Sequence, residues 1–129
     1  MHLEKTRRKV LFVCDKNRMR SPTAEKIFSE DPRLEVKSAG IKIDAAVPMS
    51  RELLEWADLI VVMEKKQRNA IRERFQDIHE SKRIVCLKIP DKFQFMDPHL
   101  IGLLRERVEP YLADEPRLTN PNSGGAIAE

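Results

Sequence analysis

Short strand-like segments that alternate with helical patterns limit the fold of this chain more than any other feature. The segments are KVLFVC (9–14), RLEVKSAG (33–40), DLIVVM (58–63) and RIVCL (83–87). Short continuous apolar runs are typical of strands buried on both faces, and strands that alternate with helices form parallel sheets. We therefore predict an α/β domain, with helices on both faces of a four-stranded parallel sheet.

Helix-start signals follow the strands. Ser21, Ser50 and Asp97 each precede a helical apolar pattern and are expected to cap a helix N-terminus. A proline follows Ser21 and Asp97, as is common in the first turn of a helix. Residues 64–75 combine many charged side chains with apolar residues at helical spacing, which indicates one charged helix with a solvated face.

Length and composition fit a single domain. The chain has 129 residues, of which 41% are hydrophobic and 35% charged. We expect a flexible N-terminus over residues 1–8, a folded domain over 9–112 and, because the end is rich in Pro, Asn, Ser and Gly, a disordered tail over 113–129. Two cysteines do not form a disulfide framework, so we expect reduced thiols and a cytoplasmic protein.

The charge pattern restricts the partners. The net charge is +3, but basic and acidic residues are intermixed, as in KKQRNAIRERFQD (65–77). No basic-aromatic alternation suggests base stacking, and no apolar run approaches the length of about 18 residues that a membrane span needs. We expect a monomer that binds an anionic ligand or an acidic surface, with neither a nucleic acid nor a membrane as partner.

The first strand ends at Cys14, and the loop CDKNRMRS (14–21) leads from it into a helix. In open parallel sheets, ligands bind beyond the carboxyl ends of the strands. Backbone N–H groups at such a turn, together with the helix dipole, form an anion-binding nest, and Arg20 can hold two phosphate oxygens. The same positive field favours the nucleophilic thiolate of Cys14. The alternative is that Cys14 is a small buried residue at a strand end.

Several segments resemble the low-molecular-weight protein tyrosine phosphatase family. They are VCDKNRMRSPTAE (13–25), SAG (38–40), ADLIVVMEKKQRN (57–69) and an aspartate-containing loop before the last helix. The likeness covers roughly residues 9–112 and implies a flavodoxin-like, phosphotyrosine phosphatase I-like fold. It also implies a reaction without metal or cofactor, in which a phosphorylated protein or small phosphomonoester reacts through a phosphocysteine.

The resemblance assigns a role to each matching residue. Cys14 would be the nucleophile, Arg20 would bind the phosphoryl oxygens, and Ser21 would donate a hydrogen bond to the thiolate or leaving sulfur. Asn17 would hold the strained backbone of the loop, supported by Ser38. The other residues of the phosphate-binding loop are Asp15, Lys16, Arg18 and Met19.

The sequence departs from the family pattern around this loop. Lys16 stands where the family usually has Gly, and Asp15 and Arg18 stand where it has apolar residues. Met19 replaces a regulatory cysteine that some members carry. The segment IKIDAAVPMS (41–50) lacks the aromatic residue that members place after SAG. Phosphotyrosine as the substrate therefore rests on the resemblance alone.

A general acid is expected within IPDKFQFMDPH (89–99). Asp97 stands in an Asp-Pro pair, as the family's acid does, but it also precedes the last helix, where an N-cap role would keep its carboxylate ionised. Asp91 follows the last strand, with Phe93 and Phe95 nearby to shield it, and the family's spacing to the last helix also matches it. We predict Asp91 as the acid, with Asp97 as the alternative.

Two other functions could use the same loop. Arsenate reduction needs further reactive cysteines or a partner thiol, and both Met19 and the position of Cys86 in an apolar strand count against the intramolecular version. A phosphocysteine carrier or a phosphate-binding module is disfavoured by Arg20, because such carriers lack an arginine that closes the loop. The three histidines share no metal-ligand spacing, so we expect no metal site.

Overall fold

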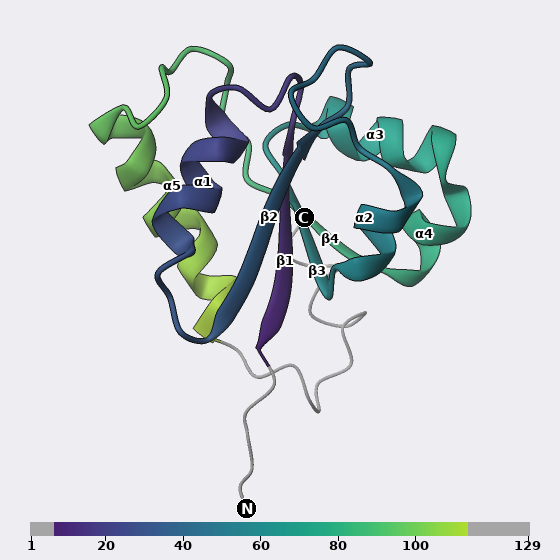
Figure 1. Cartoon of the computed structure of the whole chain (residues 1–129), viewed down its shortest axis with the longest axis horizontal. Coiled ribbons are helices and arrows are strands. Elements are labelled where there is room, and N and C mark those ends of the chain that lie inside the picture. Colours follow the sequence, from purple (N-terminus) through teal and green to yellow (C-terminus); the bar gives the residue numbers. More distant parts are fainter. Residues whose placement is uncertain (1–6, 114–129) are drawn as a thin grey trace, which may run out of the picture.

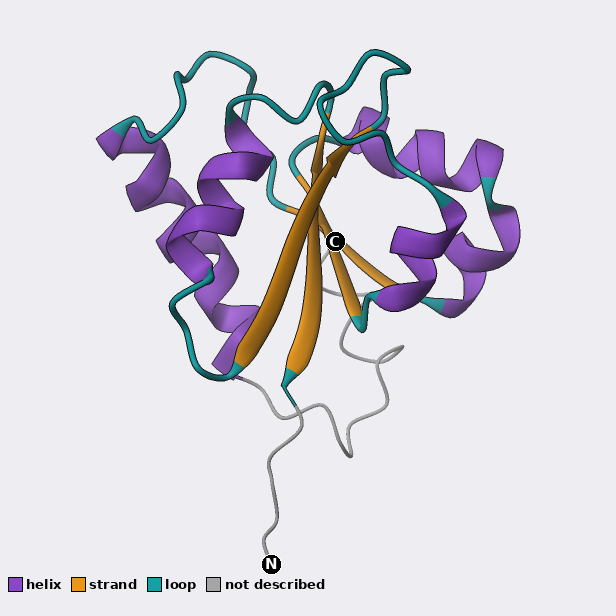
Figure 2. Ribbon diagram, viewed as in Figure 1, coloured by secondary structure: helices purple, strands orange, loops and turns teal. Residues whose placement is uncertain are grey.

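The computed structural model describes residues 7–113, which form a parallel sheet between two layers of helices (Figure 1, Figure 2). The strands are β1 (Arg8–Cys14), β2 (Leu34–Gly40), β3 (Leu59–Val62) and β4 (Arg83–Cys86). Their order is β2-β1-β3-β4 and all pairs are parallel, which confirms the predicted fold class. The strand order reverses beside β1, so the carboxyl end of β1 is the switch point at which such sheets bind ligands.

The helices divide between the two faces of the sheet. On one face lie α1 (Arg20–Phe28) and α5 (Pro98–Ala113), and on the other lie α2 (Arg51–Trp56), α3 (Lys65–Arg74) and α4 (Gln76–Ser81) (Figure 1). Within the described part of the chain, no helix has the length and apolar character needed to cross a membrane.

Strand β1 contributes to the core on both faces because neighbouring side chains of a strand point in opposite directions. Phe12 packs on the side of α1 and α5, with its ring 5.6 Å from that of Phe28. Leu11 packs on the other side, in a cluster with Leu54 and Ile71. Phe12 and Leu11 are both fully buried, which explains why the sequence of β1 is a continuous apolar run.

The predicted helix caps are correct at two positions and wrong at one. Ser50 accepts a hydrogen bond from the backbone of α2, and Asp97 accepts one from the backbone of α5. Ser21 does not cap α1: it lies inside the helix, and the N-cap residue, Met19, makes no side-chain cap. The hydroxyl of Ser21 is 3.0 Å from the sulfur of Cys14 instead, so a contact within the loop replaces the cap.

The charged helix expected over 64–75 is in fact followed at once by a second helix, α4, which the sequence analysis missed. Phe75 joins α3 to α4 with a backbone conformation of φ −140° and ψ 65°, which interrupts the helix. Its side chain packs against the core on this face of the sheet. The interruption therefore coincides with a tertiary contact rather than with a proline or glycine.

The expected domain boundaries can be compared with the structure in part. Strand β1 begins at Arg8, which pairs with β2 and is the last residue of the segment 1–8. Helix α5 ends at Ala113, the first residue of the expected tail. The remainder of these predictions concerns residues 1–6 and 114–129, which lie outside the described residues.

Candidate active site

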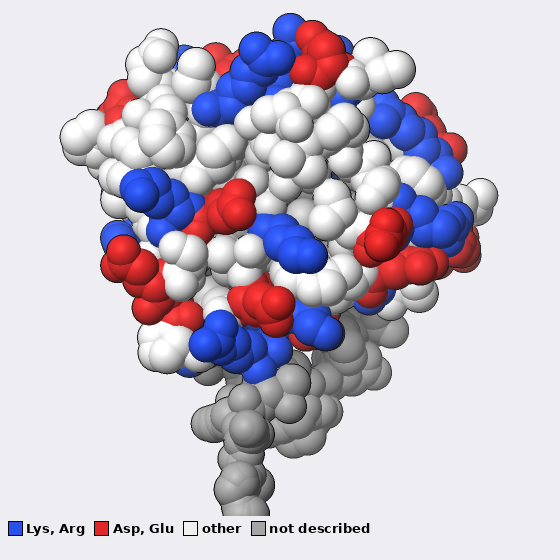
Figure 3. Space-filling view, viewed as in Figure 1, with Lys and Arg blue, Asp and Glu red and all other residues white. Residues whose placement is uncertain are grey.

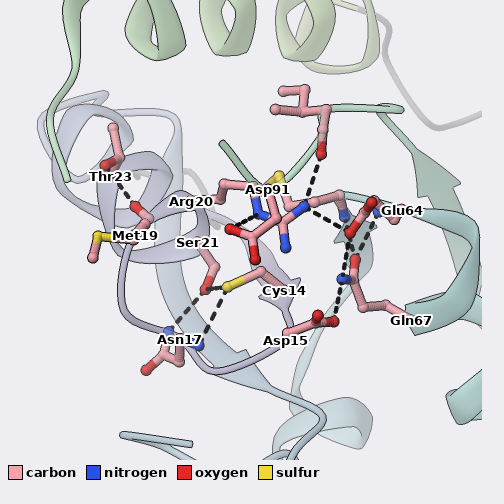
Figure 4. Close-up of polar contacts among 12 residues, drawn as sticks. Cys14, Asp15, Asn17, Met19, Arg20, Ser21, Thr23, Glu64, Gln67 and Asp91 are labelled. Atoms are coloured by element: carbon pink, nitrogen blue, oxygen red, sulfur yellow. Dashed lines mark hydrogen bonds and ion pairs between the residues drawn. The ribbon is translucent and has the colours of Figure 1, made fainter. Parts of the chain in front are cut away.

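The expected phosphate-binding loop, residues 14–21, lies at the carboxyl edge of the sheet, between β1 and α1 (Figure 4). Residues 41–49, which follow β2, pack along the loop through backbone hydrogen bonds. Residues 87–97, between β4 and α5, contact α1, and the N-terminal turn of α3 contacts the loop from a third direction. The site is thus enclosed by segments that lie far apart in the sequence.

Gly40, the glycine of the SAG segment, permits the close approach of the segment after β2. A Cβ atom on this residue would lie 2.5 Å from the carbonyl oxygen of Asp15 and 2.8 Å from Cβ of Ala45, which is closer than real side chains come. The N–H of Lys42 then donates to that same carbonyl of Asp15 at 2.9 Å. A side chain at position 40 would therefore displace the phosphate-binding loop.

The thiol of Cys14 is buried and faces two hydrogen-bond donors. Its Sγ lies 3.3 Å from the backbone nitrogen of Asn17 and 3.0 Å from Oγ of Ser21. The side-chain Nδ2 of Asn17 donates to Ser21 Oγ at 2.9 Å, so the single hydroxyl proton of Ser21 remains for another acceptor. The carbonyl of Ala39 is 3.4 Å from that hydroxyl, farther than the sulfur. The arrangement directs the Ser21 proton to the sulfur of Cys14.

Asn17 has a left-handed backbone conformation, with φ 56°. Its Nδ2 also donates to Oγ of Ser38 at 2.9 Å. Ser38 in turn donates to the carboxylate of Glu25 on α1, a residue that the sequence analysis did not single out. The loop is thereby connected through side chains to both β2 and α1.

Arg20 is almost completely buried, with 1% of its surface exposed. Its Nη1 donates to Oε1 of Glu64 at 2.9 Å and to the carbonyl of Ile89 at 2.8 Å. A guanidinium carries five N–H groups, and these bonds occupy the Nη1 pair. The edge formed by Nε and Nη2 therefore remains as the fork that can bind two phosphate oxygens. Oδ1 of Asp91 lies 3.8 Å from this Nε (Figure 4).

The first turn of α3 completes the site, although the sequence analysis assigned Lys66 to a solvated face. Nε2 of Gln67 donates to Asp15 Oδ1 at 2.8 Å, and Lys66 Nζ lies 2.9 Å from Asp15 Oδ2. Glu64 and Gln67 also form a capping box at the start of this helix. Burial works to raise the pKa of Asp15, but the hydrogen bonds from Lys66 and Gln67 and the charge of Lys66 outweigh it and hold that pKa below its usual value.

Because the pKa of Asp15 is lowered in the folded state, the free energy of unfolding depends on pH in the acidic range. A carboxyl group with a lowered folded-state pKa contributes stability above its unfolded pKa of about 4, and this is lost as pH falls through the folded pKa. We therefore expect Asp15→Asn to be less stable than wild type at neutral pH, with a difference that shrinks below about pH 4. Thermal unfolding at both pH values measures this. A difference that persists unchanged in acid would contradict the ionic role.

The other loop side chains point outward. Lys16 Nζ lies 3.5 Å from Oδ2 of Asp44, and Nη2 of Arg18 donates to the carbonyl of Asp44 at 3.1 Å. The side chain of Met19 is half-buried and points away from Cys14 (Figure 4). On the face drawn in Figure 3, basic and acidic side chains likewise lie next to one another. The side chains of Lys16, Arg18 and Met19 therefore lie on the outside of the loop, away from the sulfur of Cys14.

The two candidate acids have different surroundings. Asp97 Oδ1 accepts the backbone N–H of His99 at 2.8 Å, as an N-cap does. Asp91 lies beside Arg20 with 60% of its side chain exposed, so the expected shielding by Phe93 and Phe95 is absent. Phe93 is buried in the core, and Phe95 is 47% exposed. Of the two carboxylates, only that of Asp91 makes an ion-pair contact within the loop network.

Replacing Arg20 by lysine is expected to lower kcat by about 10²–10³, although the charge is kept. A lysine ammonium cannot donate to Glu64 and Ile89 and at the same time present a planar fork to a phosphoryl group. Steady-state rates on an aryl phosphate measure the loss, and unfolding curves report whether the buried replacement folds. If a folded Arg20→Lys variant kept the wild-type kcat, the expected role of Arg20 in binding two phosphoryl oxygens would be wrong.

Solved structures of the same architecture were found for this chain. YwlE arginine phosphatase from Geobacillus stearothermophilus has 23% identity and a TM-score of 0.65, covering 81% of this chain and 92% of that one. The tyrosine phosphatase Wzb from Escherichia coli K30, in complex with phosphate, has 18% identity and a TM-score of 0.68, with coverages of 82% and 96%. SP-PTP, a low molecular weight protein tyrosine phosphatase from Streptococcus pyogenes, has 19% identity and a TM-score of 0.67. That match covers 92% of this chain and 97% of SP-PTP. At these identities the matches establish the fold.

The family comparison concerns the loop itself. Among curated protein sequences there is no match. The family model described as low molecular weight phosphotyrosine protein phosphatase matches residues 9–45, a range that contains β1, the whole of the loop 14–21, α1 and β2. Over this range the chain is therefore similar to the low molecular weight protein tyrosine phosphatase family, and it shares the fold of the solved structures.

Proposed function

We propose that this protein is a phosphomonoesterase that works through a phosphocysteine on Cys14, without a metal cofactor, and acts on phosphotyrosine or other aryl phosphates. The observation that carries the proposal is the position of Cys14 Sγ, which lies 3.3 Å from the N–H nitrogen of Asn17 and 3.0 Å from the hydroxyl of Ser21. Beside it, the buried Arg20 keeps its Nε and Nη2 edge available. A nucleophile and an oxyanion clamp are thus supplied by one loop.

In the first step, the thiolate of Cys14 attacks phosphorus. The S–P bond forms while the P–O bond to the leaving group breaks, and Arg20 with the N–H groups of the loop stabilises the charge on the equatorial oxygens. Asp91 donates its proton to the leaving phenolate oxygen, which departs as a phenol. The products of this step are phosphocysteine and the carboxylate of Asp91.

In the second step, water attacks the phosphocysteine. The Asp91 carboxylate accepts a proton from this water, the new P–O bond forms and the S–P bond breaks. The hydroxyl of Ser21, directed to sulfur by the hydrogen bond from Asn17, stabilises the departing thiolate. The enzyme returns to its starting state with inorganic phosphate as the product, so that the net reaction consumes one water per ester.

The positions of the two cysteines count against arsenate reduction within one chain. Cys14 belongs to the core cluster on the side of α1 and α5, whereas Cys86 packs against the cluster on the opposite face of the sheet. Two thiols separated by a sheet cannot form a disulfide without a large movement of the backbone. A carrier or binding module, in turn, has no use for a carboxylate beside the loop, such as that of Asp91.

A turnover screen tests the proposal. Wild type and Cys14→Ser would be compared on phenyl phosphate, phosphotyrosine, phosphoserine, phosphoarginine, a sugar phosphate and arsenate, each with and without a chelator. We expect turnover of the aryl and tyrosyl phosphates by wild type alone, unaffected by the chelator. Preference for phosphoarginine would revise the substrate class. Arsenate reduction, or no turnover of any phosphate, would overturn the proposed function.

A further inference from the structure

Thr23, in the first turns of α1, connects the phosphate-binding loop to the segment that carries Asp91. Its side chain is completely buried, and its Oγ1 lies 2.7 Å from the carbonyl oxygen of Met19 and 2.8 Å from the backbone nitrogen of Met96. The carbonyl only accepts and the N–H only donates, so Thr23 gives its proton to Met19 and accepts from Met96. Figure 4 shows the hydroxyl directed at Met19.

The hydrogen bond between Met96 and Thr23 lies where the backbone has an uncommon conformation. Met96 has a left-handed backbone with φ 63°, which is uncommon for a residue other than glycine. It directly precedes Asp97, the N-cap of α5. The hydrogen bond from Met96 to a buried hydroxyl therefore holds the junction between the Asp91 segment and α5 in an otherwise unfavourable conformation.

Helix α1 holds the Asp91 segment at a second point as well. Arg20 donates to the carbonyl of Ile89 at 2.8 Å, while Thr23 receives the N–H of Met96. Residues three apart on a helix lie on the same face, so both contacts come from one side of α1. Asp91 lies between these two positions in the sequence, and 60% of its side chain is exposed. Its placement beside Arg20 is therefore expected to depend on these backbone anchors.

We propose that Thr23 is a positioning residue that holds the Asp91 segment in register with the phosphate-binding loop, so that the carboxyl reaches the leaving-group oxygen. This inference rests on the proposed phosphatase function and on Asp91 as its acid. Thr23 touches neither substrate nor phosphoryl group, and it acts through the backbone of Met96. Loss of the Thr23 hydroxyl is expected to move the carboxyl of Asp91 away from Cys14, while both side chains remain present.

Thr23→Val keeps the branched shape and removes both hydrogen bonds, whereas Thr23→Ser keeps the hydroxyl. We expect Thr23→Val to lower kcat on phenyl phosphate by about 10- to 100-fold, the cost of a small misplacement of a catalytic group. On nitrophenyl phosphate, whose leaving group needs little protonation, we expect a change of less than about threefold. Thr23→Ser should restore the phenyl phosphate rate. Ser29→Ala, which removes a hydroxyl–carbonyl bond at the other end of α1, is the matched control and should leave both rates unchanged.

The ratio of the rates on phenyl phosphate and nitrophenyl phosphate distinguishes misplacement of the acid from a general loss of structure. A general loss of structure would lower both rates together. If Thr23 acts through Asp91, adding Thr23→Val to Asp91→Asn should cause no further loss on phenyl phosphate. Equal losses on both substrates, or additive losses in the double variant, would overturn the proposal. If Asp91→Asn changes the ratio and Thr23→Val does not, this inference alone fails. If Asp91→Asn leaves the ratio unchanged, the assignment of the acid fails, and this inference with it.

Discussion

Cys14→Ser is expected to reduce turnover by at least about 10⁴-fold while leaving the binding of phosphate and vanadate intact, since nucleophile replacements in other covalent enzymes cause losses of this order or larger. A serine hydroxyl is a far weaker nucleophile than a thiolate. The anion cradle survives because Arg20 is held by Glu64 and Ile89, which the substitution does not touch. Initial rates on nitrophenyl phosphate and calorimetric titration with phosphate measure the two effects.

Cys86→Ala is the matched control for this prediction. Cys86 is a partly buried residue of β4 that packs on the opposite face of the sheet, so its loss should cost at most a few kcal/mol of stability. Turnover at a temperature where the variant is folded should remain near wild type. A comparable loss of activity from both substitutions would indicate a two-cysteine redox mechanism instead.

The fold was predictable because its determinants are local and periodic. The continuous apolar run of β1 reflects burial on both faces, and the caps at Ser50 and Asp97 depend on bonds within one helical turn. The interruption at Phe75 was not predictable in this way, because no proline or glycine marks it and the side chain is held by a tertiary contact. The error at Ser21 has a similar cause: a hydroxyl suited to capping is taken by Cys14.

The site was predictable where it is contiguous and was missed where it is not. Cys14, Asn17, Arg20 and Ser21 lie in one loop, and the structure brings the side chains of Cys14, Asn17 and Ser21 together with that of Ser38. The partners of the loop lie far away in the sequence, and they include Glu64, Lys66 and Gln67. The capping pair Glu64 and Gln67 was the available local signal, but it predicts only a helix start, whereas the contacts to Arg20 and Asp15 arise from the fold.

The structure also explains how the loop accommodates an aspartate next to Cys14, the proposed nucleophile. A carboxylate at position 15 would oppose the binding of a phosphate dianion if it faced the anion. It is turned instead toward α3, where Lys66 and Gln67 pair with it. The charge of Asp15 is thereby balanced within the protein, and Arg20 remains the cation that is proposed to bind the phosphoryl group.

Asp91→Asn is expected to lower kcat by about 10²–10⁴ on phenyl phosphate and much less on nitrophenyl phosphate. An amide cannot donate the proton that a phenolate leaving group requires, whereas nitrophenolate departs without it. Because Asp91 is exposed and makes only a 3.8 Å contact with Arg20, the substitution should leave stability close to wild type. Rates on both substrates, together with the pH dependence of kcat, measure the effect.

Asp97→Asn is the control that decides between the two aspartates. Asparagine caps helices about as well as aspartate, so the hydrogen bond to the N–H of His99 should persist and both rates should stay near wild type. Both substitutions change an aspartate to an asparagine. Any difference between the two variants in the rate on phenyl phosphate therefore comes from the position of the residue. Loss of phenyl phosphate turnover in Asp97→Asn, with Asp91→Asn active, would move the acid to the first turn of α5. In that case the second carboxyl oxygen of Asp97 would carry the proton while Oδ1 continued to accept the N–H of His99, because a carboxyl group that donates one proton keeps its other oxygen as an acceptor.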